Sequence, residues 1–582
     1  MPREKPEKFL SIERLINEGK TEEALEKIRK IQQNLWSSYT FNPEKALEDT
    51  LQNKKYIEKI GNDIDLGYNF LLTGYIYLLK ENYKISLEFG FRCKDLFEKI
   101  NNQNGVAASL TLIGNNYWLK GEYNQAIEYC TKSLSIEEIS ISSKASNLRV
   151  LANVFLWKGD LYQSLEYCEK GLKIAENENF FGIQVSFLWY LGMIFVFMYD
   201  VDKAENYLTR CCELAGKYQI NYIKGFVLHT MINIRIEEDD MYQAERYLDY
   251  FREYAFREND EFTTKIYSLS RGLVLIQTGR VRDRAEGETI FRQIINDGVS
   301  HVRVQALYTH ALFYLTFIYV EELKMSKDMK ILDDINPLIS TMNTMADQLG
   351  SIMLQIEGKL FQARVSLIQM KLNEAKILLA GAQHLAESTN NHYLARLISN
   401  EHDLLLELQD NQEELENIKN IRAESIKLAS LNGMVNITQK KNIKGKLELA
   451  SDQPVLLLII AEGGVLLFSY PFTDEWKHDT EIFGSFLSAF TSFIDEFFSE
   501  GLDRAKFGEN TLLIQSIGNY SIGYLYKGQS YPAKQKLATF IKEIQDNTSI
   551  WQNLEIFFKT SQVAGAKDLP QIESLIKDTF LG

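Results

Sequence analysis

Proline is scarce in this sequence and is unevenly placed. Only 8 prolines occur among 582 residues, and none lies between Lys45 and Asn336. An interior proline removes a helix hydrogen bond and clashes with the preceding turn, at a cost of about 3 kcal/mol. The proline-free stretch therefore predicts uninterrupted helices. Four prolines follow residue 450, which indicates a different fold at the end of the chain.

Cysteine is also rare, and no two cysteines have the spacing of a CxxC pair. The odd total of 5 argues against a fully paired disulfide framework. Met1 is followed by charged residues rather than by a basic segment and an apolar core, so no secretory signal is expected. These features predict a cytoplasmic protein whose cysteines fill small spaces in the core.

The chain lacks the excess of basic residues that binding to a phosphate backbone requires. Its 64 Lys and Arg residues are outnumbered by 79 Asp and Glu residues, giving a formal net charge of -15. Lys and Arg are scattered rather than arranged in a stripe. Nucleic acid is therefore not an expected partner.

Motifs for catalysis and cofactor binding are missing as well. The sequence has no GxxxxGK[ST] or GxGxxG loop, and its 7 histidines form no HExxH. No histidine has a cysteine neighbour at zinc spacing. The acidic run of residues 237–240 is typical of a solvated turn. We expect no catalytic residue, no cofactor and no metal site, and hence no enzyme.

A repeat is present in the proline-poor part. Small residues recur at intervals of 40, 38, 40, 40 and 40 residues, and the sixth position holds an arginine that fits poorly. Small side chains suit places where two helices cross closely. The residues in this series are Ser86, Ala126, Ser164, Ala204, Ala244 and Arg284.

The repeat resembles the tetratricopeptide repeat (TPR) family. Gly74 with Tyr77, Gly114 with Tyr117, and Gly192 with Phe195 match the family's small residue and the aromatic residue three positions later. The period near 40 exceeds the usual 34 residues of the family. The resemblance implies a mostly α protein with a TPR-type α-solenoid over residues 1–430.

One charge-free stretch, Phe180 to Tyr199, is long enough to span a membrane. Gly192 and Phe195 within it are in phase with the neighbouring repeats, and Ala204 follows on schedule. A helix that is apolar all round is expected inside a solenoid, where neighbours cover both faces. We predict a buried first helix of a repeat and no transmembrane segment.

In the TPR family the first helices line a concave groove that receives a peptide or a partner helix. The residue after the small position is then expected to face the groove, at Tyr75, Asn115, Asn153, Met193, Asn233 and Leu273. The asparagines offer donors and acceptors to a peptide backbone, and nearby tryptophans offer aromatic anchors. The alternative is that the asparagines bridge adjacent repeats and the tryptophans pack in the core. The groove candidates are Tyr75, Thr111, Asn115, Trp118, Arg149, Asn153, Trp157, Trp189, His229 and Asn233.

The apolar pattern changes its period after Gln453. Five strands are expected at residues 455–461, 465–472, 502–507, 511–517 and 521–526, with a glycine turn at 462–464. Helices are expected at 481–499, at 532–546 and after Pro570. This order resembles longin and roadblock domains associated with small GTPases, while profilin-like and ligand-sensing domains share similar orders. We expect a linker at residues 431–452 and a small α/β domain with a five-stranded sheet at 453–582.

These features predict an interaction adaptor or scaffold. The groove would bind a protein or peptide, and the C-terminal domain would act as a platform for a small GTPase or for pairing with another longin-like domain. The alternative is a sensor whose C-terminal domain binds a small molecule and alters the solenoid.

Overall fold

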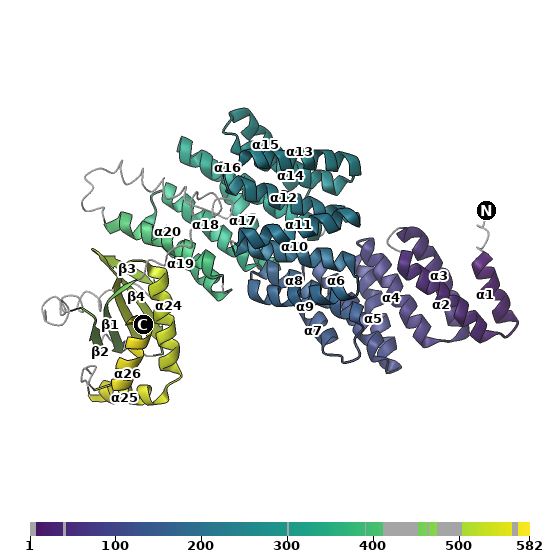
Figure 1. The fold of residues 1–582 in the computed structure, drawn as a ribbon, viewed down its shortest axis with the longest axis horizontal. Helices are drawn as coiled ribbons and strands as arrows, with labels where there is room; N and C mark the ends of the chain where they lie inside the picture. Colours follow the sequence, from purple (N-terminus) through teal and green to yellow (C-terminus); the bar gives the residue numbers. More distant parts are fainter. Residues whose placement is uncertain are drawn as a thin grey trace. The chain divides into compact units, whose positions relative to one another are not determined.

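The computed structural model describes residues 7–38, 42–198, 200–298, 302–389, 391–410, 452–461, 465–473, 503–518, 520–560 and 568–581 (Figure 1). Within these ranges the chain is mostly helical, with antiparallel strands confined to the C-terminal part. The mostly α fold class and the five-stranded sheet predicted from the sequence are confirmed.

A succession of helices precedes the sheet in the chain. They are α1 (Glu7–Asn17), α2 (Thr21–Ser38), α3 (Pro43–Ile60), α4 (Asp63–Leu79), α5 (Tyr83–Lys99), α6 (Gln103–Leu119), α7 (Tyr123–Leu134), α8 (Ile141–Lys158), α9 (Leu161–Asn177), α10 (Phe181–Phe197), α11 (Val201–Lys217), α12 (Asn221–Glu237), α13 (Met241–Glu258), α14 (Glu261–Gln277), α15 (Val281–Asn296), α16 (Val302–Ser326), the short η1 (Met329–Ile331), α17 (Leu332–Leu349), α18 (Ile352–Ile368), α19 (Leu372–Ser388) and α20 (His392–Asp410).

Several of the turns between these helices share one arrangement. A residue in the left-handed region ends one helix, and an Asn or Asp then caps the next. Asn101 has a φ of 53°, and the side chain of Asn102 accepts a hydrogen bond from the Gly105 amide at 2.8 Å. Gly159 and Asp160 repeat the pattern before α9. Such caps satisfy amides that have no partner within the helix.

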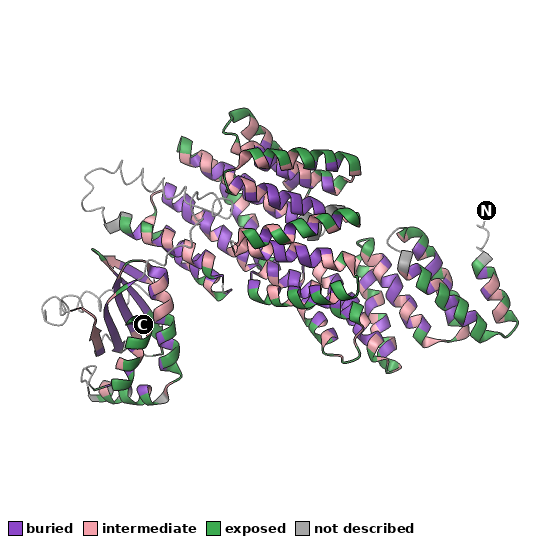
Figure 2. Cartoon of the chain, in the orientation of Figure 1, coloured by how far each residue is buried: buried purple, intermediate pink, exposed green. Residues whose placement is uncertain are grey.

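The described chain forms two compact units. The first contains α1 to α15, the first half of α16 and residues 345–351. The second contains residues 237–240, 313–344 and the described residues from 352 onward. In both units the buried residues lie on the sides of helices and strands that face their neighbours (Figure 2).

Small residues lie at the helix crossings, as the repeat predicts. Ser86, Ala126, Ser164, Ala204 and Ala244 are each 0% exposed. The hydroxyl of Ser164 donates to the carbonyl of Ala152 at 2.7 Å, from α9 to α8. The series therefore marks true contacts between paired helices up to α13.

The sixth residue of the predicted series does not lie at the close helix crossing. Arg284 is only half-buried in α15. The close approach is made three residues later by Gly287, where an added Cβ would lie 2.7 Å from Ile276 and 3.1 Å from the carbonyl oxygen of Gly272. The small residue has shifted by almost one helical turn, so an arginine is tolerated at the original position.

The charge-free stretch forms a helix of the repeat array. It falls mainly on α10, which packs against α8, α9 and α11 in the first unit. Phe187, Leu188, Leu191 and Ile194 are buried in one cluster with residues of those neighbours. Among the described helices, none combines the length and apolar character needed to cross a membrane.

The C-terminal sheet has the strand order β2-β1-β5-β4-β3, and all its neighbours are antiparallel. Its elements are β1 (Gln453–Ala461), β2 (Val465–Pro471), β3 (Arg504–Phe507), β4 (Asn510–Ile517), β5 (Tyr520–Lys527), α24 (Ser530–Gln545), α25 (Thr548–Thr560), α26 (Pro570–Ile576) and η3 (Lys577–Leu581). One face of the sheet is buried together with α24, α25 and α26. The sequence did not predict α25.

The sheet is joined to α19 and α20 by buried polar contacts around Arg504. This side chain is 0% exposed, and its guanidinium donates to Ser399 at 2.9 Å, to Asp403 at 3.0 Å and to Asp503 at 3.1 Å. It also donates to the Gln383 side chain. Arg504 therefore fixes β3 against the two helices within the second unit.

The charged side chains around Arg504 form ion pairs of opposite sign. Burial by itself would raise the pKa of Asp503, but the adjacent Arg504 and Lys534 cations hold it well below its ordinary value. Lys534 lies 2.8 Å from Asp503 and 3.1 Å from Glu387. We call Arg504, Asp403, Asp503, Gln383, Ser399, Lys534 and Glu387 the Arg504 network.

Three sequence predictions lie outside the described residues: the linker at 431–452, apart from Asp452, the turn at 462–464 and the helix at 481–499. The domain boundaries at 430 and 453 therefore stay predictions.

Candidate functional site

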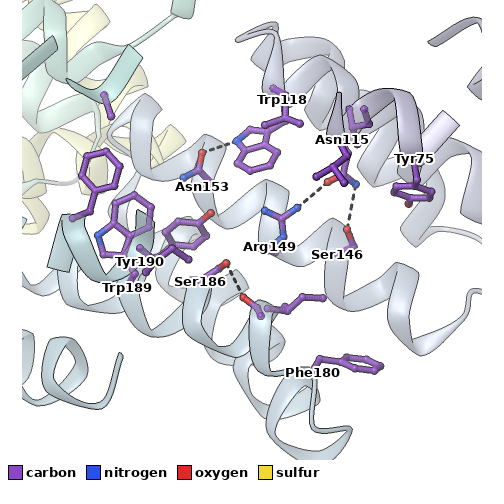
Figure 3. A pocket seen from close by; sticks show the side chains of 18 of the residues that line it. Tyr75, Asn115, Trp118, Ser146, Arg149, Asn153, Phe180, Ser186, Trp189 and Tyr190 are labelled. Carbon is purple, nitrogen blue, oxygen red and sulfur yellow. Dashed lines mark hydrogen bonds between the residues drawn. The ribbon is translucent and has the colours of Figure 1, made fainter. Parts of the chain in front are cut away.

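A groove opens in the first unit beside the first helices of successive repeats. It has a volume of about 540 Å³ and is lined mainly by residues of α4, α6, α8, α10 and α12, together with Tyr83 of α5 and Ala306 of α16. We call this the aromatic groove, because tryptophan, tyrosine and phenylalanine side chains supply much of its wall (Figure 3).

Seven of the ten predicted groove residues line the aromatic groove. Helix α4 contributes one, α6 two, α8 three and α10 one. They are Tyr75, Asn115, Trp118, Arg149, Asn153, Trp157 and Trp189.

Two sets of hydrogen bonds join lining residues of α6 to lining residues of α8. The Trp118 indole N–H donates to Asn153 Oδ1 at 2.6 Å. Arg149 donates to Asn115 Oδ1 at 2.8 Å, and the Asn115 amide donates to Ser146 at 3.2 Å. Figure 3 shows these contacts side by side. The two asparagines thus bridge adjacent repeats, as the alternative interpretation held, while also lining the groove.

Aromatic rings form a second wall farther along the groove. Trp189 of α10 stacks on Phe226 of α12, with ring centroids 5.3 Å apart and planes inclined by 19°. Its indole nitrogen is buried and has no hydrogen-bond partner among the described residues. Trp189 is half-buried, so the ring is partly covered by protein and partly open to the groove.

The other three predicted residues do not line the aromatic groove. Thr111 is buried and donates to the carbonyl of Ala107 at 2.9 Å, close to the Ser133 hydroxyl. Asn233 lies on α12, half-buried and outside the lining. His229 is 3% exposed, with Nδ1 3.0 Å from the Ser270 hydroxyl. Leu273 from the predicted row is also fully buried. The residue after the small position therefore lines the groove in α4, α6 and α8, but not in the later first helices.

The position of His229 predicts acid sensitivity. Burial, reinforced by the neighbouring His310, lowers the pKa of His229 well below its ordinary value of 6.5. As the pH falls, His229 is protonated in the unfolded chain before it is protonated in the folded chain. The folded state is therefore not penalised by this histidine above about pH 6.5, and it loses stability as the pH falls below that value. We expect a loss of about 1.4 kcal/mol per pH unit in that range.

Thermal unfolding at pH 7.5, 6.5 and 5.5 checks this expectation. His229→Gln should make the loss of stability with falling pH less steep, whereas His384→Gln, at an exposed site on α19, should leave the slope unchanged. Equal slopes for His229→Gln and the wild type would show that His229 titrates normally in the folded chain.

The sequence missed several residues of the groove. Phe180, Phe181 and Ile183 come from the start of α10, and Ser146 and Tyr190 complete the wall. Phe180 and Phe181 belong to the charge-free stretch, whose aromatic content was a usable signal. A further contact had no signal: the Ser351 hydroxyl donates to the carbonyl of Trp157 at 2.7 Å, across 194 positions of sequence.

Four of the five cysteines are small core residues, as predicted, and Cys212 is half-buried. Cys93, Cys130, Cys168 and Cys211 are each 0% exposed and are free thiols. Burial raises the pKa of Cys130 to about 12, which suppresses the thiolate form at neutral pH. Within the described residues, no group of three or more His, Cys, Asp or Glu side chains has an arrangement that would hold a metal ion.

Comparison with known proteins identifies the repeat. Residues 107–139, which run from within α6 through α7 to the turn before α8, match the tetratricopeptide repeat. The match assigns one helix pair to this repeat, and the neighbouring helix pairs are arranged as a TPR-like solenoid. A search of curated protein sequences finds no match.

Solved structures with related helical arrays show only distant likeness. Aspartyl phosphate phosphatase F from Bacillus subtilis is 14% identical, with a TM-score of 0.41, over 57% of this chain and 93% of its own. A Rap protein complexed with competence and sporulation factor is 15% identical, with a TM-score of 0.35, over 69% of this chain and 99% of its own. A circular tandem repeat protein is 14% identical, with a TM-score of 0.15, over 74% of this chain and 95% of its own. Likeness at this level assigns no activity to this chain.

Proposed function

We propose that this chain is a non-enzymatic, cytoplasmic protein-binding scaffold, and that the aromatic groove receives an extended segment of a partner protein. The observation that carries the proposal is that seven of the predicted groove residues line one groove. Concave surfaces made by stacked repeats are the usual binding faces of solenoids.

The chemistry of the groove suits a peptide chain. Trp118, Trp189 and Tyr75 offer broad apolar faces, and aromatic residues of this kind carry much of the binding energy at protein interfaces. The Asn153 amide nitrogen makes no hydrogen bond to another described residue. An unused donor beside aromatic rings is suited to a peptide carbonyl.

Site-specific photo-cross-linking tests this proposal. A benzophenone amino acid replaces Ser186, which lines the groove, and in a second protein replaces Tyr162, which is exposed on α9. Both full-length proteins are irradiated in native lysate. We expect a discrete product from position 186 only, and mass spectrometry of the product gives the partner segment. Equal products from the two positions would count against the groove.

The recovered segment, made as a synthetic peptide, allows the aromatic wall to be tested. We expect Trp189→Ala to weaken its binding at least about tenfold, because removal of a central aromatic anchor usually costs 2 kcal/mol or more. Tyr162→Ala should have no effect. Titration calorimetry measures both, and circular dichroism checks that the helices persist. Unchanged affinity for Trp189→Ala would show that the peptide binds elsewhere.

For the C-terminal domain, predicted at residues 453–582, we propose a platform role. The resemblance to longin and roadblock domains supports contact with a small GTPase or pairing with another such domain. Light scattering of the full chain tests pairing, and capture of GTPases loaded with GDP or a GTP analogue tests the other contact. If both fail while a small molecule raises the melting temperature, the sensor alternative replaces this role.

A further inference from the structure

The carboxylate of Asp403 on α20 is held by two elements of the C-terminal sheet region, by which we mean β1 to β5 with α24, α25, α26 and η3. Its Oδ1 accepts from Arg504 Nη1 of β3 at 3.0 Å. At the start of α24, the Ser530 amide donates to Oδ2 at 3.0 Å and the Ser530 hydroxyl donates to Oδ1 at 2.5 Å. A guanidinium and the first amides of a helix both favour an anion. Asp403 therefore occupies a carboxylate-binding site whose donors belong to the sheet region.

A second carboxylate of α20 pairs with the same strand. Glu407 lies one helical turn after Asp403, and its carboxylate is 3.2 Å from Lys506 Nζ on β3. Arg504 and Lys506 are two positions apart, so their side chains leave the strand on the same side. Four residues of helix rise by about 6 Å and two residues of strand by about 7 Å, so the two spacings match. The two cations of β3 are thus spaced for two carboxylates one helical turn apart.

The contact of α19 and α20 with the sheet region is largely polar. Within the part of the chain that the structure describes, the buried apolar clusters on the two faces of the sheet contain no residue of α19 or α20. Ion pairs cross the contact with the cation on the sheet region and the carboxylate on a helix: Arg504 with Asp403, Lys506 with Glu407, and Lys534 with Glu387. Polar contacts of this kind allow neighbouring parts of a chain to separate.

Asp503 provides the cations with a partner that does not depend on α20. Its carboxylate lies 3.1 Å from Arg504 and 2.8 Å from Lys534. An unpaired charge in a buried place is costly, and Asp503 would avoid that cost if α20 moved away. The donors that hold Asp403 would then be open to another carboxylate.

We propose that Arg504, Lys506 and the first turn of α24 form a binding site for an acidic helix of a partner protein, and that α20 fills this site until the partner replaces it. The partner helix presents two carboxylates one turn apart, as Asp403 and Glu407 do. The inference rests on the platform role proposed for the C-terminal domain, and it names the chemistry of the partner. It does not depend on the aromatic groove.

Rescue by a small carboxylate tests whether the site accepts a ligand from outside the chain. In full-length Asp403→Ala we expect hydrogen exchange at the start of α24 to be about tenfold faster, the range for a lost hydrogen bond to a charged group. Sodium acetate should slow this exchange again, and sodium chloride at the same concentration should not. Glu374→Ala, which removes an exposed carboxylate of α19, should exchange as the wild type with either salt.

A synthetic peptide with the sequence of residues 392–410 tests for the acidic helix. The full-length double variant Asp403→Ala/Glu407→Ala should bind it at least about tenfold more tightly than the wild type, whose own α20 fills the site. A peptide with Asn and Gln in place of its two carboxylates should not bind, and adding Lys506→Gln to the double variant should weaken binding of the acidic peptide. Titration calorimetry measures the affinities, and circular dichroism checks the fold.

Glu407→Gln alone repeats the peptide test with little disturbance of the core, because this side chain is 54% exposed. It should show a smaller gain in affinity in the same direction. Faster exchange in Asp403→Ala that acetate does not slow would overturn the proposal, because the site would then accept only Asp403. Equal binding of the acidic and amide peptides, equal binding to the wild type and the double variant, or no binding would also overturn it. Light scattering and GTPase capture would still decide the platform role separately.

Discussion

Arg504→Ala is expected to destabilise the second unit by about 3–5 kcal/mol, the range found when one partner is removed from a buried ion pair. The substitution leaves Asp403 without its cation, leaves Asp503 with Lys534 alone, and removes donors to Ser399 and Gln383. Arg504→Lys should lie between this variant and the wild type, since lysine keeps the charge and loses the planar fork.

Hydrogen exchange of the full chain measures this effect where it arises. In Arg504→Ala, the amides of β3 and β4 and those of α20 should exchange faster, and the unfolding transition should shift to lower temperature. Lys577→Ala removes an exposed ion pair with Glu573 and should change neither result. Exchange rates in Arg504→Ala that match the wild type would show that β3 is not held by the Arg504 network.

Gly171→Ala should destabilise the first unit by about 3 kcal/mol, near the upper end for overpacking of a core. An added Cβ would lie 2.0 Å from the Phe187 ring, which is 0% exposed and belongs to a tightly packed cluster. Because the ring is buried among other core side chains, the added Cβ requires the ring, its neighbours or the helices to shift.

A second glycine inside a helix, Gly381, is expected to show the opposite effect on stability when it is replaced by alanine. At Gly381, inside α19, the nearest atom to an added Cβ is Lys359 Nζ at 3.6 Å, an ordinary contact. Gly381→Ala should stabilise the chain by about 0.5–1 kcal/mol through helix propensity. Urea denaturation of both variants gives the comparison. In a Phe187→Leu background, Gly171→Ala should cost less, and an unreduced cost would mean that contact with the ring is not the cause.

The solenoid was predictable because its signals are local and repeated. Ser86, Ala126 and Ser164 recur at helix crossings, and each crossing demands a small side chain regardless of what lies farther away. Asn102 and Asp160 cap helices through contacts three residues along the chain. The strands of the C-terminal sheet were predictable for the same reason, because short apolar runs between turns form them.

Contacts between distant parts of the chain were not predictable. The shift from Arg284 to Gly287 depends on how α14 and α15 cross, and the sequence period does not encode that crossing. Burial of His229 against Ser270 likewise depends on a neighbouring repeat. The Arg504 network joins residues more than 100 positions apart, so its charges read in sequence as ordinary surface residues.

The candidate site lies between these two cases. The position after the small residue in the first helices predicted Tyr75, Asn115 and Asn153 as groove-facing, and these three residues line the aromatic groove. The same rule failed for Leu273, which is buried. Successive repeats rotate relative to one another, so a fixed position faces the groove in some repeats and a neighbouring helix in others.

The most direct test of the central claim is hydrogen exchange of the full-length protein with and without the peptide recovered by cross-linking at position 186. Binding in the aromatic groove predicts slower exchange in α6, α8 and the first half of α10, with no change on α13. Protection confined to α13, or to the C-terminal sheet, would contradict the claim that the aromatic groove is the binding site.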